Sequence, residues 1–407
     1  MAEEIEKKLL QTEEKLSSLF KRIDDIAFYN QKKVLKAYNE ARVNTQCFAG
    51  TTGYGYGDLG RETLAKVYAS VFGGESAIVS PLLTCGTHTI STVLYGLLRR
   101  GDVMLSVSGQ PYDTILSTIF GKDNNSLEEL GVIYKQIDLL ENSEFDYPKI
   151  EKMVKKLKPK MVYLQRSRGY SERNAISPYK MKDLFNLVKR LSPKTFIVVD
   201  NCYGEFVDKI EPTDVGADVI MGSLIKNAGG GLASTGGYIV GTQKAIDLIA
   251  TRFTNPSLKT EVGSYEFGYR VYFQGFFLAP HTVAQSLKGA CLIGQIMQDL
   301  GYKVIPSNDI QPQDIVKSVV FGNEKDLIKF VQTVQSISPV ESYVTPYPWD
   351  MPGYDDKVIM AAGTFVGGSS IELSCDGPIR EPYIAYFQGG LTYEHVRVLA
   401  EKLLELY

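Results

Sequence analysis

The sequence predicts an α/β fold, with a mainly parallel sheet in a large lobe and a smaller α/β lobe at the C-terminus. Two observations carry this prediction. Short Val/Ile-rich runs alternate with amphipathic helical segments between about residues 60 and 280, a pattern typical of βαβ units. The chain has 407 residues, which exceeds the roughly 250–300 at which a single hydrophobic core stops growing.

The N-terminal segment predicts a long helix over residues 3–42. Leu9, Leu16, Phe20, Ile23 and Val34 recur near helical spacing. A helical arm of this kind packs on a partner or on the second lobe, or it lies on the surface of its own subunit. Both arrangements stay open at this point. We expect the arm to comprise residues 1–48.

The large lobe is expected to span residues 49–285, in which helices and strands alternate. Each predicted strand is a short apolar run, and each predicted helix shows apolar residues at helical spacing. Helices are predicted at 62–73, 87–98, 111–120 and 178–193, and strands at 75–81, 102–108, 161–167, 195–201, 218–224 and 236–241.

The pattern changes beyond the large lobe, and we expect residues 286–407 to form the small one. A long helix at 281–300 links the two lobes. It is followed by the apolar runs 303–306 and 314–322, a helix at 324–336, a proline-rich loop at 344–356, the segment GGSSIELS at 367–374 and a last helix that ends at Tyr407.

Composition argues against several classes of function. A net charge of −3 without a basic stripe gives no support for binding to nucleic acid or to a membrane surface. Five cysteines lie far apart, and the acidic, amphipathic N-terminus is neither a secretion signal nor a transit peptide, so we expect reduced thiols and a cytoplasmic location. The three histidines are also far apart, so no metal site is expected.

Chemically useful side chains follow three of the predicted strands. Asp200 ends the strand at 195–201, Lys226 follows the strand at 218–224, and Gly86 and Thr87 lie where a loop enters a helix. Ligands of open α/β sheets bind at the carboxyl ends of the strands. Each residue alone has an ordinary structural explanation: a turn for Asp200, a solvated side chain for Lys226 and a helix cap for Gly86 and Thr87.

Taken together, these residues suit one cofactor. A carboxylate can hold a protonated ring nitrogen, a lysine can form an imine with an aldehyde, and a helix N-terminus can bind a phosphate. Pyridoxal 5′-phosphate (PLP) has these three groups and requires a Schiff-base lysine and a partner for its ring nitrogen. The glycine run behind Lys226 would keep side chains from crowding this lysine and the strand that follows.

Several motifs carry a resemblance to a known family. The chain contains D-x-x-Y-G-x-F from Asp200, S-x-x-K-N from Ser223, and the segments TTGYGYGDLGRETL, CGTHTI, YLQRSRGYSER and DGPIREPY. It resembles the fold-type I PLP enzymes, and more narrowly the bacterial methionine gamma-lyase-like or aluminium-resistance proteins, which are relatives of the cystathionine lyases. The resemblance implies a PLP-transferase fold of the aspartate aminotransferase type, with a seven-stranded sheet.

The same resemblance implies a role for each matching residue. Lys226 would carry PLP as a Schiff base and Asp200 would face the pyridinium nitrogen. Tyr112 would stack on the ring, although His88 is a rival for this role. Further roles are phosphate binding by Gly86, Thr87 and Ser223, contact with a neighbouring subunit's cofactor by Tyr54, Tyr56 and Arg61, and binding of the substrate carboxylate by Arg380, with Tyr54 also near the substrate.

One segment departs from the cystathionine lyases. QRSRGYSER at 165–173 is rich in arginine and lacks their Asn-Pro signature. We expect Arg166 and Arg168 to be surface residues, and the alternative is that they contact an anionic substrate.

The function implied is a PLP-dependent carbon–sulfur lyase that acts on a sulfur amino acid. Lys226 would remove the Cα proton, and a tyrosine such as Tyr112 or Tyr56 would protonate the leaving group. A PLP-dependent aminotransferase, aldolase or racemase is the alternative, because the same lysine and aspartate serve all of these. A non-catalytic binding protein is disfavoured, since GGGLASTGG lacks the order of a phosphate-binding loop. A homo-oligomer is expected, at least a dimer, with a tetramer favoured.

Overall fold

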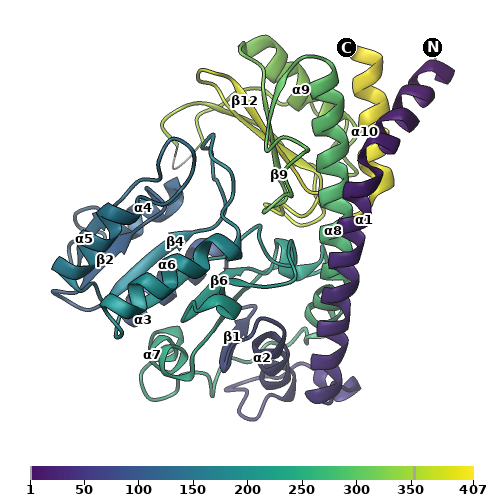
Figure 1. The fold of residues 1–407 in the computed structure, drawn as a ribbon. Helices are drawn as coiled ribbons and strands as arrows, with labels where there is room; N and C mark the ends of the chain where they lie inside the picture. Colours follow the sequence, from purple (N-terminus) through teal and green to yellow (C-terminus); the bar gives the residue numbers. More distant parts are fainter. Residues whose placement is uncertain (1, 352–353) are drawn as a thin grey trace.

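The computed structural model describes residues 2–351 and 354–407, in two lobes that are each built on one sheet (Figure 1). The predicted α/β class and the seven-stranded sheet are confirmed. The strand order of the larger sheet is β1-β7-β6-β5-β4-β2-β3, and β7 is the antiparallel member. The strands are β1 (Ser76–Ser80), β2 (Val103–Ser106), β3 (Ile133–Gln136), β4 (Met161–Gln165), β5 (Phe196–Asp200), β6 (Val219–Ser223) and β7 (Gly237–Gly241).

Helices cover both faces of this sheet, so the central strands are buried throughout and their sequences are apolar on both sides. One face packs against α3 (Gly86–Leu97), α4 (Asp113–Ile119) and α7 (Gln243–Phe253). The other packs against α2 (Leu59–Val71), α5 (Tyr147–Leu157) and α6 (Pro178–Leu191). The helices predicted at 62–73, 87–98, 111–120 and 178–193 are all present with shifted ends, whereas α5, α7 and β3 are additional.

The small lobe contains an antiparallel sheet in the order β10-β11-β12-β9-β8. The proline-rich loop predicted at 344–356 includes residues 352–353, which lie outside the described residues. The boundaries expected for the domains stay a prediction. The elements are β8 (Lys303–Ile305), β9 (Val316–Val320), α9 (Glu324–Ser336), β10 (Val358–Ala361), β11 (Ser374–Pro378), β12 (Ile384–Gln388) and α10 (Tyr393–Leu406).

Two long helices span both lobes, α1 (Ala2–Glu40) and α8 (Arg270–Asp299), and they lie side by side in Figure 1. The α8 helix begins before the predicted 281 and continues through Pro280. A proline inside a helix removes a hydrogen bond, but the preceding turns bury Tyr272, Phe273 and Phe276, and this burial holds the helix together.

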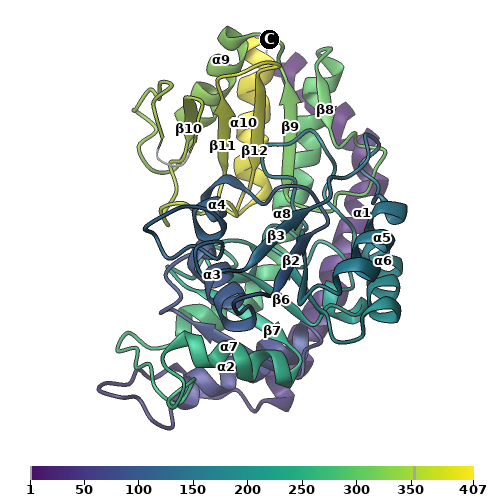
Figure 2. The same ribbon diagram turned by 90° about the vertical axis from the view of Figure 1, so that its left-hand side faces the viewer.

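The N-terminal arm packs on its own subunit. Leu9, Leu16 and Ile23 of α1 are buried against α8 and α10, and Figure 1 shows both chain ends at the outer edge of the small lobe. Figure 2 shows the two sheets one above the other, with α4 at the level where the lobes meet. Among the described residues, no helix combines the length and apolar character needed to cross a bilayer.

Candidate active site

A cavity of about 650 Å³ opens where the carboxyl ends of β4, β5 and β6 face the small lobe. Gly86, Tyr112, Asp200 and Lys226 line it from the large lobe, and Arg380 lines it from the small lobe. The structure therefore brings five of the sequence-predicted residues to one cavity.

Asp200 is the last residue of β5 and is 2% exposed. The backbone N–H of Cys202 donates a hydrogen bond to its Oδ1 at 3.1 Å. Burial raises the pKa of Asp200, while the charge of Lys226 and the hydrogen bonds from Cys202 act in the opposite direction. The turn at 200–206 holds this carboxyl group, with Tyr203 and Phe206 both at positive φ.

Lys226 follows β6 and begins the 3-10 helix η3 (Asn227–Gly229). Its Nζ lies 3.9 Å from the centroid of the Tyr203 ring. Burial lowers the pKa of Lys226. Negative charges on Tyr203, Cys202 and Tyr112 would have the opposite effect and, together, would raise the pKa of Lys226 above its ordinary value. Burial also raises the pKa of Cys202 and raises that of Tyr112 to about 12. These two neighbours are therefore neutral near pH 7, and their attraction for the ammonium ion is confined to alkaline solution.

The start of α3 faces the end of β6. A Cβ atom on Gly86 would lie 3.4 Å from Ser223 Cβ and 4.0 Å from Cys202 Sγ, so a larger residue would narrow this corner of the cavity. The first backbone N–H groups of a helix have no intrahelical acceptors, which makes this end suitable for an anion. The amine of Lys226, the carboxylate of Asp200 and this helix end fit the three groups of PLP.

Tyr112 and His88 differ in position. Tyr112 lines the cavity, its Oη lies 2.7 Å from Thr87 Oγ1, and its backbone N–H donates to Gln165 Oε1 at 2.8 Å. His88 is exposed, and its Nδ1 accepts a hydrogen bond from Thr84 N at 3.1 Å. This geometry favours Tyr112 for the predicted contact with the ring.

Tyr54, Tyr56 and Arg61 lie away from this cavity. The two tyrosines are exposed and stack on each other, with ring centroids 5.5 Å apart. Arg61 is buried, and its guanidinium donates to the carbonyl oxygens of Gly55, Glu261 and Gly263. Arg61 thus fixes the loop that presents the tyrosines, and their contact with a neighbouring subunit stays a prediction.

Arg380 lies in the turn after β11 at the wall of the cavity. Its Nη1 lies 3.0 Å from Asp356 Oδ2, in a pair whose side chains are 53% and 38% exposed. Both side chains are accessible, so the guanidinium can exchange this carboxylate for that of a small molecule.

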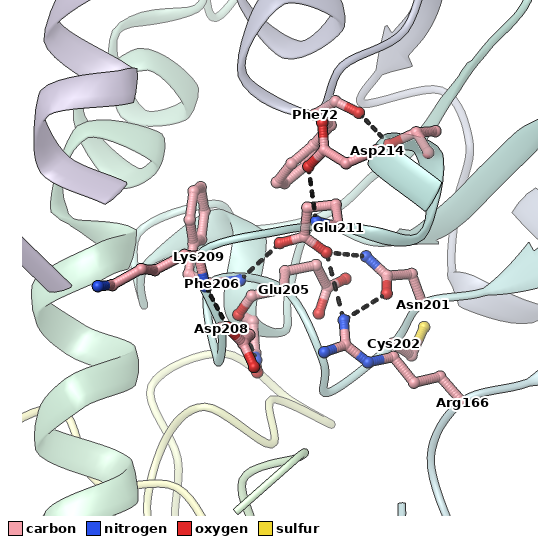
Figure 3. A network of polar contacts seen from close by, with 12 residues as sticks. Phe72, Arg166, Asn201, Cys202, Glu205, Phe206, Asp208, Lys209, Glu211 and Asp214 are labelled. Carbon is pink, nitrogen blue, oxygen red and sulfur yellow. Dashed lines mark hydrogen bonds and ion pairs between the residues drawn. The ribbon is translucent and has the colours of Figure 1, made fainter. Parts of the chain in front are cut away.

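The expectation that Arg166 is a surface residue is wrong, because its side chain is completely buried. Figure 3 shows it beneath the turn that follows Asp200. Arg166 Nη1 donates to Asn201 Oδ1 at 2.8 Å and to Glu211 Oε2 at 3.2 Å, and Asn201 Nδ2 also donates to Glu211 Oε2 at 3.0 Å. The arginine therefore holds the carboxyl end of β5, where Asp200 lies.

The expectation for Arg168 is wrong for a similar reason, since this residue is 2% exposed. Its guanidinium donates to Ile305 O at 2.6 Å, Val316 O at 3.1 Å and Ser318 Oγ at 3.2 Å, and lies 3.4 Å from Asp314 Oδ1. All four partners belong to the small lobe. Arg168 borders the cavity, but its side chain joins the two lobes.

The glycine run also has a role that was not predicted. A Cβ atom on Gly230 would lie 2.1 Å from Gly275 O, and one on Gly229 would lie 1.7 Å from Leu224 O. Gly230 lets the turn after Lys226 approach α8 closely, because a side chain there would overlap backbone atoms of the helix.

Among the cavity residues that the sequence analysis did not single out are Tyr203, Gln165 and Asp376. Tyr203 is the tyrosine of the D-x-x-Y-G-x-F motif, so its position was visible. Gln165 is the last residue of β4 and pairs with Asp200 in the neighbouring strand. Its place at the carboxyl end of a predicted strand could have identified it as a site residue. Asp376 lies in the middle of β11, where no local pattern marks it.

Comparisons with known proteins agree with this geometry. The family model described as "Methionine gamma-lyase" matches residues 5–406. The uncharacterized protein YnbB of Bacillus subtilis (strain 168) is 44% identical over 396 residues, which is 97% of this chain and 94% of YnbB.

Two solved structures are also similar. One is a carbon-sulfur lyase involved in aluminum resistance from Clostridium novyi NT, with a TM-score of 0.95 and 44% identity, over 100% of this chain and 96% of that one. The other is cystathionine gamma synthase from Xanthomonas oryzae pv. oryzae, with a TM-score of 0.63 over 92% and 97% of the chains and 13% identity, which shows the fold alone. The chain therefore belongs to the methionine gamma-lyase family, a family of PLP-dependent lyases.

Proposed function

We propose that this protein is a carbon–sulfur lyase that acts on a sulfur-containing amino acid, with PLP held on Lys226. The observation that carries the proposal is the placement of Lys226 and Asp200 on one cavity, at the ends of two neighbouring strands. The family match and the Clostridium novyi protein described as a carbon-sulfur lyase support the reaction class.

Residues of the cavity, together with the neighbouring Thr87 and Ser223, would each have a separate role. Bound PLP supplies a conjugated ring that accepts the electron pair left on Cα when its proton is removed. Lys226 Nζ would hold the cofactor and, once released, take the Cα proton. Asp200 would keep a proton on the ring nitrogen. Gly86, Thr87 and Ser223 would receive the phosphate.

Arg380 is proposed to bind the substrate α-carboxylate. Its present partner is Asp356, at 3.0 Å, which lines an adjoining hollow that also borders Arg380. An incoming carboxylate would take the place of Asp356 and gain a charge-assisted hydrogen bond from the guanidinium. This exchange would align Cα with Lys226.

The experiment uses the purified protein loaded with PLP. Methionine, cystathionine and cysteine are supplied separately, and release of keto acid and of thiol is measured. A lyase yields both products from at least one of these amino acids. No product from any of them would refute the lyase function, and conversion of the bound cofactor to its amine form would indicate transamination instead.

The link to Lys226 is tested apart from turnover. Borohydride reduction followed by peptide mapping is expected to find the cofactor on the peptide that contains Lys226. Lys226→Ala should lose the absorbance of the bound cofactor and all turnover while keeping its fold. The exposed Lys244→Ala is the matched control and should keep both. Label on any other lysine of the wild type would contradict the assignment.

The protein is further proposed to be a homo-oligomer, with a dimer as the smallest active unit. The exposed, stacked Tyr54 and Tyr56 would lie at the subunit contact and approach the neighbouring cavity. Light scattering coupled to size exclusion would measure the mass at working concentration. A fully active monomer would contradict the shared site.

A further inference from the structure

A carboxyl group on the small lobe faces the cavity and has no role in the proposal so far. Asp376 occupies the middle of β11, where its Cα pairs with those of Met360 and Tyr386 in the neighbouring strands. Aspartate is depleted in strands, so an aspartate in the middle of a strand is unusual. Asp376 lines the same cavity as Lys226.

The fold makes little use of this carboxyl group. Gln388 Nε2 lies 3.5 Å from Asp376 Oδ2, at the limit of a hydrogen bond. Among the described residues, no lysine or arginine forms an ion pair with it. Tyr170 lies on the same wall, between the rings of Tyr354 and Tyr386 at centroid distances of 5.5 and 4.9 Å.

This setting lets the carboxyl group hold its proton to a higher pH than an ordinary aspartate does. Burial raises the pKa of Asp376 to about 6, while the nearby hydroxyl group of Tyr170 and the charge of Lys226 lower it. Tyr354 and Tyr386 also lie near it, and burial raises the pKa values of both. Near neutral pH a fraction of Asp376 is thus protonated, and it is a stronger acid than an ordinary thiol.

Asp113 and the two tyrosines named from the sequence are less suited to act as this acid. Tyr112, which the sequence analysis named together with Tyr56, has a pKa of about 12, and its hydroxyl group lies 2.7 Å from Thr87 Oγ1. Asp113 lies near Arg380 and close to Asp355 and Asp356, with which it lines an adjoining hollow. Tyr56 lies outside the cavity of its own subunit.

We propose that Asp376 is the acid that protonates the departing sulfur. As the carbon–sulfur bond breaks, its electron pair goes to sulfur, and the carboxyl proton of Asp376 moves to that sulfur, which gives a neutral thiol. The carboxylate then regains a proton from water as the thiol leaves. No oxidation or reduction of sulfur occurs. This inference rests on the proposed lyase function and assigns one further catalytic residue to it.

The test compares two substrates of similar shape whose thiols differ in acidity. The two substrates are S-phenylcysteine and S-cyclohexylcysteine. If the wild type cleaves homocysteine derivatives instead, S-phenylhomocysteine and S-cyclohexylhomocysteine replace them. An aryl thiolate leaves without help, whereas an alkyl thiolate needs an acid. Asp376→Asn should therefore lower kcat/KM by roughly 10²–10⁴-fold for the cyclohexyl substrate and by less than about tenfold for the phenyl substrate. Asp376→Glu keeps a carboxyl group, so its kcat/KM for the cyclohexyl substrate relative to that for the phenyl substrate should be closer to the wild-type ratio.

The wild type alone gives a second measurement. Both substrates need Lys226 as base, so the pH dependence of this base drops out when kcat/KM for the cyclohexyl substrate is divided by kcat/KM for the phenyl substrate. This ratio should fall as pH rises through about 6, the pKa of Asp376. In the cofactor-free protein, the infrared carboxyl band that Asp376→Asn removes should titrate in the same range. The pH dependence of the wild-type ratio remains available if the asparagine variant is poorly folded or inactive, and the infrared measurement requires only that this variant folds.

The outcomes separate this inference from the proposed function. Equal losses on both substrates, or a ratio that does not change with pH, would refute Asp376 as the acid while the wild type still releases thiol. Absence of thiol release from the wild type with every substrate would refute the lyase function itself. Asp113→Asn is the matched control, since its carboxyl group lies on the same cavity, and any loss should be equal on the two substrates.

Discussion

Glu205 is a carboxyl group that folding takes out of water without a direct ion pair. It is completely buried, and its Oε1 accepts a hydrogen bond from Tyr238 Oη at 2.7 Å. Its Oε2 has no hydrogen-bond partner among the described residues. Burial therefore raises its pKa from 4.5 to about 8, against the lowering effects of Tyr238 and Arg166. The folded protein keeps a proton that the unfolded chain releases.

This raised pKa predicts a stability that falls as pH rises. Between pH 4.5 and about 8 the folded state binds one more proton at Glu205 than the unfolded state does. The free energy of unfolding then decreases by up to about 1.4 kcal/mol per pH unit from this group. Glu205→Gln should remove this decrease and should be more stable relative to the wild type at pH 8 than at pH 5. Urea denaturation across this range measures the difference.

The control for this prediction is an exposed glutamate. Glu401→Gln changes the same group on the outer face of α10, where folding takes little water from the carboxylate. Its pH profile should follow that of the wild type. Parallel profiles for Glu205→Gln and the wild type would mean that Glu205 is ionised in the folded protein.

At the scale of elements, the turn after β6 is held against α8 by glycine. Gly230 has φ 57°, and an added Cβ would overlap Gly275 O at 2.1 Å. Gly101 has φ 85°, but nothing lies within 4 Å of its added Cβ. Gly101→Ala should cost about 1–2 kcal/mol from the left-handed backbone alone. Gly230→Ala should cost a further 1–3 kcal/mol or so, because backbone atoms must move.

Gly230→Ala should also disturb the site, because Gly230 and Lys226 are the two residues that flank η3. Gly230→Ala is expected to bind less cofactor at saturating PLP, and Gly101→Ala should bind as much as the wild type. Thermal unfolding and cofactor absorbance measure the two effects. Equal losses of stability in both variants would show that the turn can move away from α8 without strain.

At the scale of the molecule, the sequence predicts what local pattern and strand topology determine. Asp200 and Lys226 were found because the carboxyl ends of neighbouring parallel strands meet at one edge. Arg166 and Arg168 were misjudged because their partners, Glu211 and Asp314, lie 45 and 146 residues further along the chain. Asp376 was not predicted, because its place in the site depends on how the small lobe packs against the large one. Local sequence cannot show which loop another lobe will cover.

The buried contact between the lobes leads to the last prediction. Arg168 and Asp314 are both nearly inaccessible and lie 3.4 Å apart. Arg168→Ala would leave the carboxylate of Asp314 buried without its cation, a loss worth roughly 3–5 kcal/mol. Lys303 and Glu172 join the same loop to the small lobe at 3.4 Å, but with side chains 67% and 49% exposed. Lys303→Ala should therefore cost about 0–1 kcal/mol.

Thermal and urea unfolding of the two variants would measure this difference directly. The Arg168 loop also carries Tyr170 on the cavity wall, so weaker attachment of the small lobe should lower kcat/KM in Arg168→Ala and leave it unchanged in Lys303→Ala. Similar small losses of stability in both variants would mean that water reaches Asp314 once the arginine is gone. The lobes would then be held together mainly by α1 and α8, which span both of them.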